Sequence, residues 1–489
     1  MKLLTAKTIS ALFFVLFTGL TFTKVLAQKS KALRPNIVLI IGDDIGAGDI
    51  GCYGNQQVKT PVIDRIAKEG LRFTNVFLTS SSCSPSRCSI ISGRYPHNTG
   101  AAELHTPLPA EVSIFPELLK NAGYYTAQAG KWHMGEYAKR GFDVVYDKSK
   151  DNGDGGEEMW VKTLQQRPKR KPFFMWLASY DGHRPWGQNS FAGTNRADNL
   201  SLPPYFADAI NTRIDLAKYY DEVTRFDYYI GKVEAELKKQ GVLDNTIIII
   251  IGDNGRPFPR AKTRVYDSGM QTPLIIKWNK KIHKADISEA LISVIDIAPT
   301  LLDVAGVTIL PSFQGKSFKK IIFNPSLEFR KYVFAEHNWH DYQALERTVR
   351  TKDFLYVLNL RASLNNPGAA DITSSPSFKD LQNIRDSGKL SAAQSDVFIT
   401  PRPFEEFYNC HQDPMQLVNI ASVKSYADQL ANLRKIMAQW QLETKDSNPS
   451  QLTKDWYDRG NGKRLSGKQI RGEMPGGENA IKTNASGPF

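Results

Sequence analysis

Residues 36–41 read Asn-Ile-Val-Leu-Ile-Ile, and this apolar run ends in Gly42-Asp43-Asp44. A short, almost continuous apolar run is typical of a strand that is buried on both faces of a parallel sheet. A second run of this kind, at residues 246–251, ends in Gly252-Asp253-Asn254. Strands that alternate with helices indicate an α/β domain with a large, mostly parallel β-sheet flanked by helices. Helical spacing of apolar residues places the helices near residues 61–69, 112–121 and 211–239.

The polar residues after the two runs indicate a metal site. In open α/β sheets, ligands bind in the crevice at the carboxyl ends of the strands. If the two strands are parallel neighbours, Asp43, Asp44, Asp253 and Asn254 meet there, and three close carboxylates repel one another unless a cation neutralises them. Oxygen ligands suit calcium or magnesium rather than zinc. These residues could instead only cap the helices that follow, but the occurrence of both pairs favours a metal.

The chain is longer than one hydrophobic core supports, so a large domain and a smaller one are expected from its 489 residues. The α/β pattern predicts a catalytic domain at residues 28–330. Short strand-like segments and a helix near residues 425–442 predict a smaller C-terminal α+β subdomain at residues 331–445. Residues 446–489 are rich in Gly, Ser, Asn and Lys, which predicts a weakly ordered tail.

The N-terminus is typical of a secretory signal peptide. Lys2 and Lys7 precede an apolar run at residues 11–22, and a small residue, Ala27, ends the segment. This pattern predicts cleavage after residue 27 and export to the periplasm or the medium. The run is too short for a membrane span.

The formal charge of +13 favours an anionic partner. Nucleic acid, an acidic membrane and a sulfated or carboxylated polymer all fit that charge. The sequence contains no RNA- or DNA-binding motif, and an exported protein seldom meets nucleic acid. An extracellular polyanion is therefore the favoured partner, with no nucleic acid and no membrane span.

The four cysteines, at positions 52, 83, 88 and 410, could form two disulfides in an exported protein. The segment Ser82-Cys83-Ser84-Pro85-Ser86-Arg87, followed by Gly93, favours a different role for Cys83. It resembles the signature of the formylglycine-dependent sulfatases of the alkaline phosphatase superfamily. The resemblance implies an alkaline phosphatase-like fold and the oxidation of Cys83 to formylglycine (3-oxoalanine) by a sulfatase-maturing enzyme. Cys83 would then be unavailable for a disulfide.

Further segments extend the resemblance. Gly130-Lys131-Trp132-His133-Met134-Gly135 is similar to a second block of the family, His183 to its second histidine, and Lys262 to a later cation. By this resemblance the catalytic residues are Cys83, Arg87, Lys131, His133, His183 and Lys262, and one Ca²⁺ is held by Asp43, Asp44, Cys83, Asp253 and Asn254. A hydrated aldehyde would attack sulfur, with His133 as base and His183 as acid.

The resemblance implies a sulfated saccharide as substrate. Ser374-Ser375-Pro376-Ser377-Phe378-Lys379-Asp380-Leu381 is similar to the heparan N-sulfatases (sulfamidases), whereas residues 267–273 are closer to polysaccharide sulfatases. Both N-sulfated amino sugars and O-sulfated polymers such as ulvan or a glycosaminoglycan therefore stay open. A phosphoester hydrolase of the same superfamily and a non-catalytic polyanion-binding protein stay open as well. The candidate saccharide contacts are His97, His105, Arg260, His337, Trp339 and His340.

Overall fold

The structure is a computed structural model that describes residues 34–187, 189–282 and 286–489. The predicted signal peptide, residues 1–27, lies outside these ranges. Within the described residues, no helix combines the length and the apolar character that crossing a bilayer requires.

The two apolar runs form neighbouring parallel strands, β1 and β6, inside an eight-stranded sheet with the order β4-β3-β5-β1-β6-β7-β2-β8. The bounds are β1 Asn36–Gly42, β2 Leu71–Phe77, β3 Tyr125–Gly130, β4 Val144–Tyr146, β5 Phe173–Ala178, β6 Thr246–Gly252, β7 Leu274–Trp278 and β8 Asp286–Ser293. Every pairing is parallel except those of β7, which runs antiparallel to β6 and β2. The predicted α/β fold class is therefore confirmed.

Both faces of the sheet are covered by helices, as the character of β1 predicts. Ile37, Leu39 and Ile41 belong to one core together with residues of α2, α3 and α8. Val38 and Ile40 face a second core that includes residues of α1, α5 and α6. The bounds of these helices are α1 Pro61–Glu69, α2 Cys83–Ser92, α3 Phe115–Asn121, α5 Glu158–Gln166, α6 Ile210–Lys239 and α8 Ile297–Val304.

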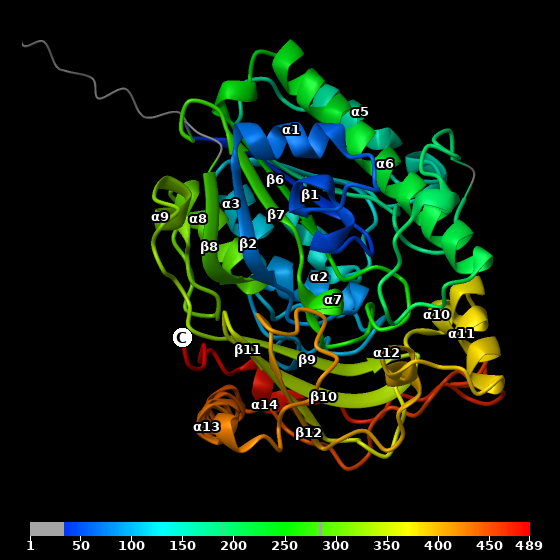
Figure 1. Cartoon of the computed structure of the whole chain (residues 1–489). Coiled ribbons are helices and arrows are strands. Elements are labelled where there is room, and N and C mark those ends of the chain that lie inside the picture. The colour runs from blue at the N-terminus through cyan, green and yellow to red at the C-terminus, as the bar shows by residue number, and fades with distance from the viewer. Residues whose placement is uncertain (1–33, 188, 283–285) are drawn as a thin grey trace, which may run out of the picture. The chain divides into compact units, whose positions relative to one another are not determined.

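The C-terminal part contains a second, antiparallel sheet with the order β12-β11-β10-β9. Its strands are β9 Val333–His340, β10 Tyr342–Arg350, β11 Phe354–Asn359 and β12 Glu405–Asn409. The remaining α-helices are α4 Ser149–Asn152, α7 Asp267–Met270, α9 Lys319–Phe323, α10 Ala370–Thr373, α11 Pro376–Asp386, α12 Ala392–Ser395, α13 Ala427–Thr444 and α14 Gly477–Ile481. Figure 1 shows the small sheet close to α2 and α7.

The composition after residue 445 predicts a weakly ordered tail, but the structure describes specific contacts there. The Arg94 guanidinium donates to the carbonyl oxygens of Ile481 and Thr483 at 2.7 and 2.8 Å. Asn98 donates to the carbonyl oxygen of Ala480 at 2.9 Å. The difference arises because buried polar groups near α2 find their hydrogen-bond partners in this segment.

Candidate active site

The four predicted metal ligands lie together at the carboxyl ends of β1 and β6. Gly42 and Gly252 are register partners, so the residues that follow them emerge side by side. The amide of Asp44 donates to Asp253 Oδ1 at 3.1 Å, and the amide group of Asn254 donates to Asp44 Oδ1. These four side chains belong to residues with no exposed surface.

Cys83 begins α2 and reaches the same place. Its Sγ lies 3.8 Å from Asp44 Oδ1, and the residue is 1% exposed. Burial raises the pKa of this thiol well above its ordinary value, although Lys131 and Lys262 act in the opposite direction. A protonated thiol is a weak nucleophile, so unmodified Cys83 is poorly suited to attack. All four cysteines have free thiols, so the alternative of two disulfides is not realised.

Each carboxylate of the site is paired with one buried cation. Arg87 Nε donates to Asp253 Oδ2 at 2.7 Å, Lys262 Nζ donates to Asp44 Oδ2 at 2.8 Å, and Lys131 pairs with Asp43. With Asp371, which also contacts Lys262, the site has three positive and four negative side chains before any ligand binds. A divalent cation and a sulfate group could enter together with little change in net charge.

The end of β3 directs Lys131 into the site. Gly130 has a φ of +95°, and a Cβ at this position would lie 1.8 Å from the carbonyl oxygen of Ala178. Only glycine fits this close approach. The Lys131 amide then donates to the same carbonyl oxygen at 2.9 Å, which fixes the turn.

Several polar atoms of the site are buried without a hydrogen-bond partner. They are Asp43 Oδ1, Asn254 Oδ1 and Arg87 Nη2. Two unpartnered oxygens beside three carboxylates suit a hard, oxygen-seeking cation. Possible ligand atoms of Asp43, Asp44 and Cys83 also lie within 4.8 Å of one another. The residues present therefore fit Ca²⁺.

Two histidines face each other beside the nucleophile helix. His105 Nδ1 lies 2.6 Å from His133 Nε2, and the His105 amide donates to Ser84 Oγ at 2.8 Å. Both histidines have a φ of +64°, a conformation that is uncommon outside glycine and is concentrated at functional sites. Burial, followed by Lys131, lowers the pKa of His133 well below its ordinary value.

His183 lies close to Asp44, with possible ligand atoms of the two residues within 4.8 Å of each other. Its Nδ1 contacts the Arg184 carbonyl oxygen, so this nitrogen carries a proton. Its Nε2 lies 3.9 Å from Asp371 Oδ2. A cavity of about 830 Å³ opens beside these residues and is lined by Asp43, Lys131, Lys150, Tyr180, His183 and Glu222, among others.

Sequence reasoning missed Asp371, which lies in α10 of the C-terminal part. Its Oδ2 is 3.1 Å from Lys262 Nζ. Burial would raise the pKa of Asp371, but Lys262 and His183 outweigh it and hold the pKa below its ordinary value. The one available signal is that Asp371 stands three residues before the sulfamidase-like block that begins at Ser374.

The six candidate saccharide contacts do not lie together. His105 lies beside His133, and His340 Nδ1 lies 2.8 Å from Ser82 Oγ, so both border the start of α2. Arg260 is buried and donates to Asp396 at 2.9 Å. His337 and Trp339 are 2% and 1% exposed within β9. The role of Arg260, His337 and Trp339 as saccharide contacts stays a prediction.

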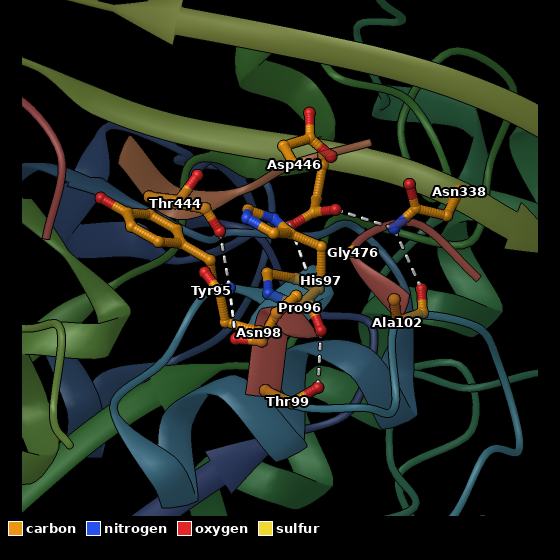
Figure 2. A network of polar contacts seen from close by, with 12 residues as sticks. Tyr95, Pro96, His97, Asn98, Thr99, Ala102, Asn338, Thr444, Asp446 and Gly476 are labelled. Carbon is orange, nitrogen blue, oxygen red and sulfur yellow. Dashed lines mark hydrogen bonds and ion pairs between the residues drawn. The ribbon is translucent and has the colours of Figure 1, made fainter. Parts of the chain in front are cut away.

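His97 is likewise buried, within a polar network between α2 and the small sheet. Figure 2 shows it among Asn338, Thr444 and Asp446. His97 Nδ1 lies 2.8 Å from Glu336 Oε1, and Asn338 donates to Glu336 Oε2 at 2.9 Å. His97 is 1% exposed and is held by these contacts, and its role as a saccharide contact stays a prediction.

Comparison with known proteins agrees with this geometry. The sulfatase family model matches residues 35–307, and the model described as "N-sulphoglucosamine sulphohydrolase, C-terminal" matches residues 260–395. An ulvan-active sulfatase of Formosa agariphila is 29% identical over 474 residues, covering 85% of this chain and 77% of the relative. Human N-sulphoglucosamine sulphohydrolase is 31% identical over 463 residues, covering 85% of this chain and 91% of the relative.

A solved structure of a protein bound to D-glucosamine-2-N,6-O-disulfate has the same fold. It has a TM-score of 0.65 and 23% identity, and the match covers 84% of this chain and 98% of that one. Fold and site together define a hydrolase of the alkaline phosphatase superfamily. The chain belongs to the sulfatase family.

Proposed function

We propose that this sulfatase removes sulfate groups from a sulfated saccharide with a formylglycine formed from Cys83 and one calcium ion. The observation that carries the proposal is the position of Cys83 Sγ, 3.8 Å from Asp44 Oδ1. Cys83 is the first residue of the buried helix α2. Around it lie the carboxylates of Asp43, Asp44 and Asp253 and the cations Arg87, Lys131 and Lys262. Such a site can hold a divalent ion and an anionic group next to one reactive side chain.

Asp43, Asp44, Asp253, Asn254 and the modified side chain at position 83 would hold the calcium ion. When bound, calcium polarises sulfate oxygens and lowers the pKa of a hydroxyl group near it. A hydrated aldehyde at position 83 supplies one hydroxyl group as the nucleophile and a second one that allows sulfate to leave.

The surrounding side chains bind the sulfuryl group and move protons. Arg87, Lys131 and Lys262 offset negative charge that builds up on the sulfuryl oxygens as the bond breaks. His133, kept neutral by its lowered pKa, accepts the proton when the sulfated hydrate breaks down. His183 donates a proton from Nε2 to the leaving oxygen or nitrogen.

The saccharide would occupy the cavity of about 830 Å³ beside His183. The relatives that support a saccharide are named for ulvan and for N-sulphoglucosamine. The basic charge of the chain favours attraction of a polyanion. A sulfamidase activity on N-sulfated glucosamine is the second candidate, because the N-sulphoglucosamine sulphohydrolase C-terminal model covers residues 260–395.

The burial of Cys83 also bears on its maturation. A residue that is 1% exposed is inaccessible to another enzyme in the folded chain. The maturing enzyme is therefore proposed to act before folding, on an unfolded chain that is exported to the periplasm or the medium. Residues 28–330 would then form the catalytic domain, and residues 331–445 the subdomain that adds Asp371 to the site.

Mass spectrometry of the peptide that contains Cys83 tests the mechanism. Protein from the native host should have the mass of an aldehyde in place of the thiol, and an unmodified thiol would contradict the proposal. Sulfate release is then measured side by side from N-sulfoglucosamine, sulfated glycosaminoglycans and ulvan oligosaccharides. Release from none of them, or phosphate release from phosphoesters instead, would overturn the assignment of a saccharide substrate.

A further inference from the structure

Asp371 adds a fourth carboxylate to the site, beside Lys262 and His183, where a sulfate-binding site has little use for one. Lys262 Nζ is already 2.8 Å from Asp44 Oδ2, so Asp371 is not needed to neutralise it. A carboxylate repels an anionic sulfate and can only accept hydrogen bonds. The presence of Asp371 therefore requires a reason other than binding of the sulfuryl group.

One oxygen of Asp371 is still available. Oδ2 contacts Lys262 at 3.1 Å, whereas Oδ1 is buried and has no hydrogen-bond partner. Buried polar atoms are usually hydrogen-bonded. A buried acceptor that lacks a partner in the protein can therefore receive a hydrogen bond from a ligand.

The nearby cationic side chains do not donate a hydrogen bond to Asp371 Oδ1. Arg184 donates to both carboxylate oxygens of Asp215 and to the carbonyl oxygen of Pro257. His340 Nδ1 is engaged with Ser82 Oγ. Within the described part of the chain, the contacts that Lys262 and His183 make with Asp371 both go to Oδ2.

Asp371 lies between the proposed sulfuryl-binding residue Lys262 and the proposed proton donor His183, so it borders the bond between the sulfur and the leaving atom. His183 Nε2, the proposed proton donor to the leaving atom, lies 3.9 Å from Asp371 Oδ2. Atoms of Asp371, His183 and Asp44 also lie within 4.8 Å of one another. A group bonded to the carbon that bears the leaving atom, or to its neighbour, would come within reach of Oδ1.

We propose that Asp371 determines specificity by accepting a hydrogen bond from a hydroxyl or N–H group that the sugar carries at or next to the sulfated position. This inference rests on the proposed function and narrows it. The substrate class becomes sulfated sugars with a neighbouring donor, whether the donor is a hydroxyl or a sulfamate nitrogen. Sulfate esters that lack such a donor gain nothing from Asp371.

The test compares Asp371→Asn and Asp371→Ala with the wild type on saccharide sulfates and on 4-nitrophenyl sulfate, which has no neighbouring donor. The saccharides are N-sulfoglucosamine, glucosamine 3-sulfate and ulvan oligosaccharides. We expect kcat/KM on the preferred saccharide to fall by about 10- to 100-fold, the range for a hydrogen bond to a charged group. The loss on 4-nitrophenyl sulfate, which reflects only the contacts of Asp371 with Lys262 and His183, should be at least about threefold smaller than the loss on the saccharide, since no such bond is lost there.

Asp244→Asn is the matched control. This carboxylate is 53% exposed and pairs with Lys280 on the surface, so its removal should alter neither activity. If N-sulfoglucosamine is the preferred substrate, its 3-deoxy methyl glycoside separates the two donors. A loss that persists on this analogue assigns the donor to nitrogen, and a loss that disappears assigns it to the neighbouring hydroxyl. A greater loss on O-sulfated sugars also assigns the donor to a hydroxyl. An equal loss on saccharides and 4-nitrophenyl sulfate, or no loss on any substrate, overturns the proposal.

A measurement on the wild type keeps the inference testable if the variants fold poorly. The wild type should cleave the preferred sugar sulfate about 10-fold or more faster than its deoxy analogue that lacks the neighbouring donor. Equal rates would overturn the role of Asp371. Failure of the proposed function looks different, because the wild type would then cleave 4-nitrophenyl sulfate and no saccharide sulfate at all.

Discussion

His105 and His133 share one short hydrogen bond, with 2.6 Å between Nδ1 of His105 and Nε2 of His133. His133 Nδ1 is buried and has no partner of its own. One proton lies between His105 Nδ1 and His133 Nε2. His105 therefore influences which nitrogen of His133 is free to accept a further proton. The backbone amide of His105 also donates to Oγ of Ser84, the residue after Cys83. His105 is therefore a positioning residue for His133.

Replacement of the two histidines should have unequal effects on turnover. We expect His133→Ala to lower kcat by about 10²- to 10⁴-fold, the usual contribution of a general base. His105→Ala should lower kcat by about 2- to 10-fold, the rate equivalent of one neutral hydrogen bond. Steady-state kinetics on the best saccharide substrate measures both, and His411→Ala, which removes an exposed histidine paired with Asp353, is the control. Equal losses in the two variants would contradict this division of roles.

The pH profile should reflect the lowered pKa of His133. The neutral imidazole is the active base, so activity is retained until the pH falls through the pKa of His133. Burial and Lys131 hold that pKa below its ordinary value of about 6.5, so the acid limb of kcat should lie below about pH 6.5. His105→Ala admits water to His133 and should move the acid limb to higher pH. An acid limb above pH 7 in the wild type would rule out a catalytic base with a lowered pKa.

Calcium should be required for activity but not for folding. Asp43, Asp44 and Asp253 each have a cation partner without a metal, so chelation leaves no unpaired carboxylate charge. We expect a chelator to abolish sulfate release and to lower Tm reversibly. Added Ca²⁺ should raise the free energy of unfolding by about 2.7 kcal/mol at 100 times its Kd. Differential scanning calorimetry measures the shift, which should shrink in Asn254→Ala.

The sequence predicted the parts of the site that follow strands and missed those that depend on the small sheet. Asp43 and Asn254 follow apolar runs, and the parallel pairing of those runs is enough to bring them together. Asp371 follows no strand and enters the site from a short helix in the C-terminal part, so no local pattern marks it. His97 stands close to the Cys83 motif in sequence, but the small sheet covers it. Sequence proximity to a motif therefore says little about which side chains reach a substrate.

Two cysteines in one helix allow a controlled test of the nucleophile. Cys83 and Cys88 are both in α2 and are 1% and 0% exposed. We expect Cys83→Ala to lose essentially all turnover, because the covalent step is removed. Cys88→Ala should keep kcat and lose about 1 kcal/mol of stability, since it only shortens a packed side chain. Sulfate-release assays and thermal unfolding of both variants measure this, and substantial turnover by Cys83→Ala would contradict a covalent mechanism.

The buried network around His97 should contribute to stability and not to turnover. Arg347 forms ion pairs with two carboxylates of this network. Its Nε lies 2.7 Å from Asp446 Oδ2, and its Nη2 lies 3.8 Å from Glu336 Oε2. Arg347→Met would leave both acids buried with one fewer cation, which typically costs about 3–5 kcal/mol. Thermal unfolding at pH 7 should show this loss, while kcat at a temperature well below Tm stays unchanged.

The loss caused by Arg347→Met should also depend on pH in a defined direction. Burial alone would raise the pKa of Glu336, but His97 and then Arg347 hold it below its ordinary value, and Arg347 has the same effect on Asp446. A depressed folded-state pKa adds stability above the unfolded pKa of about 4, and this stability is lost as the pH falls through the folded value. The difference in Tm between wild type and Arg347→Met should therefore be nearly constant from about pH 7 to about pH 5 and shrink as the pH falls below about 4. Arg434→Met, which breaks the more exposed pair with Glu405, should cost at most about 1 kcal/mol at pH 7. If both variants lost the same stability, or if the loss did not vary with pH, the buried ion pairs would not be the cause.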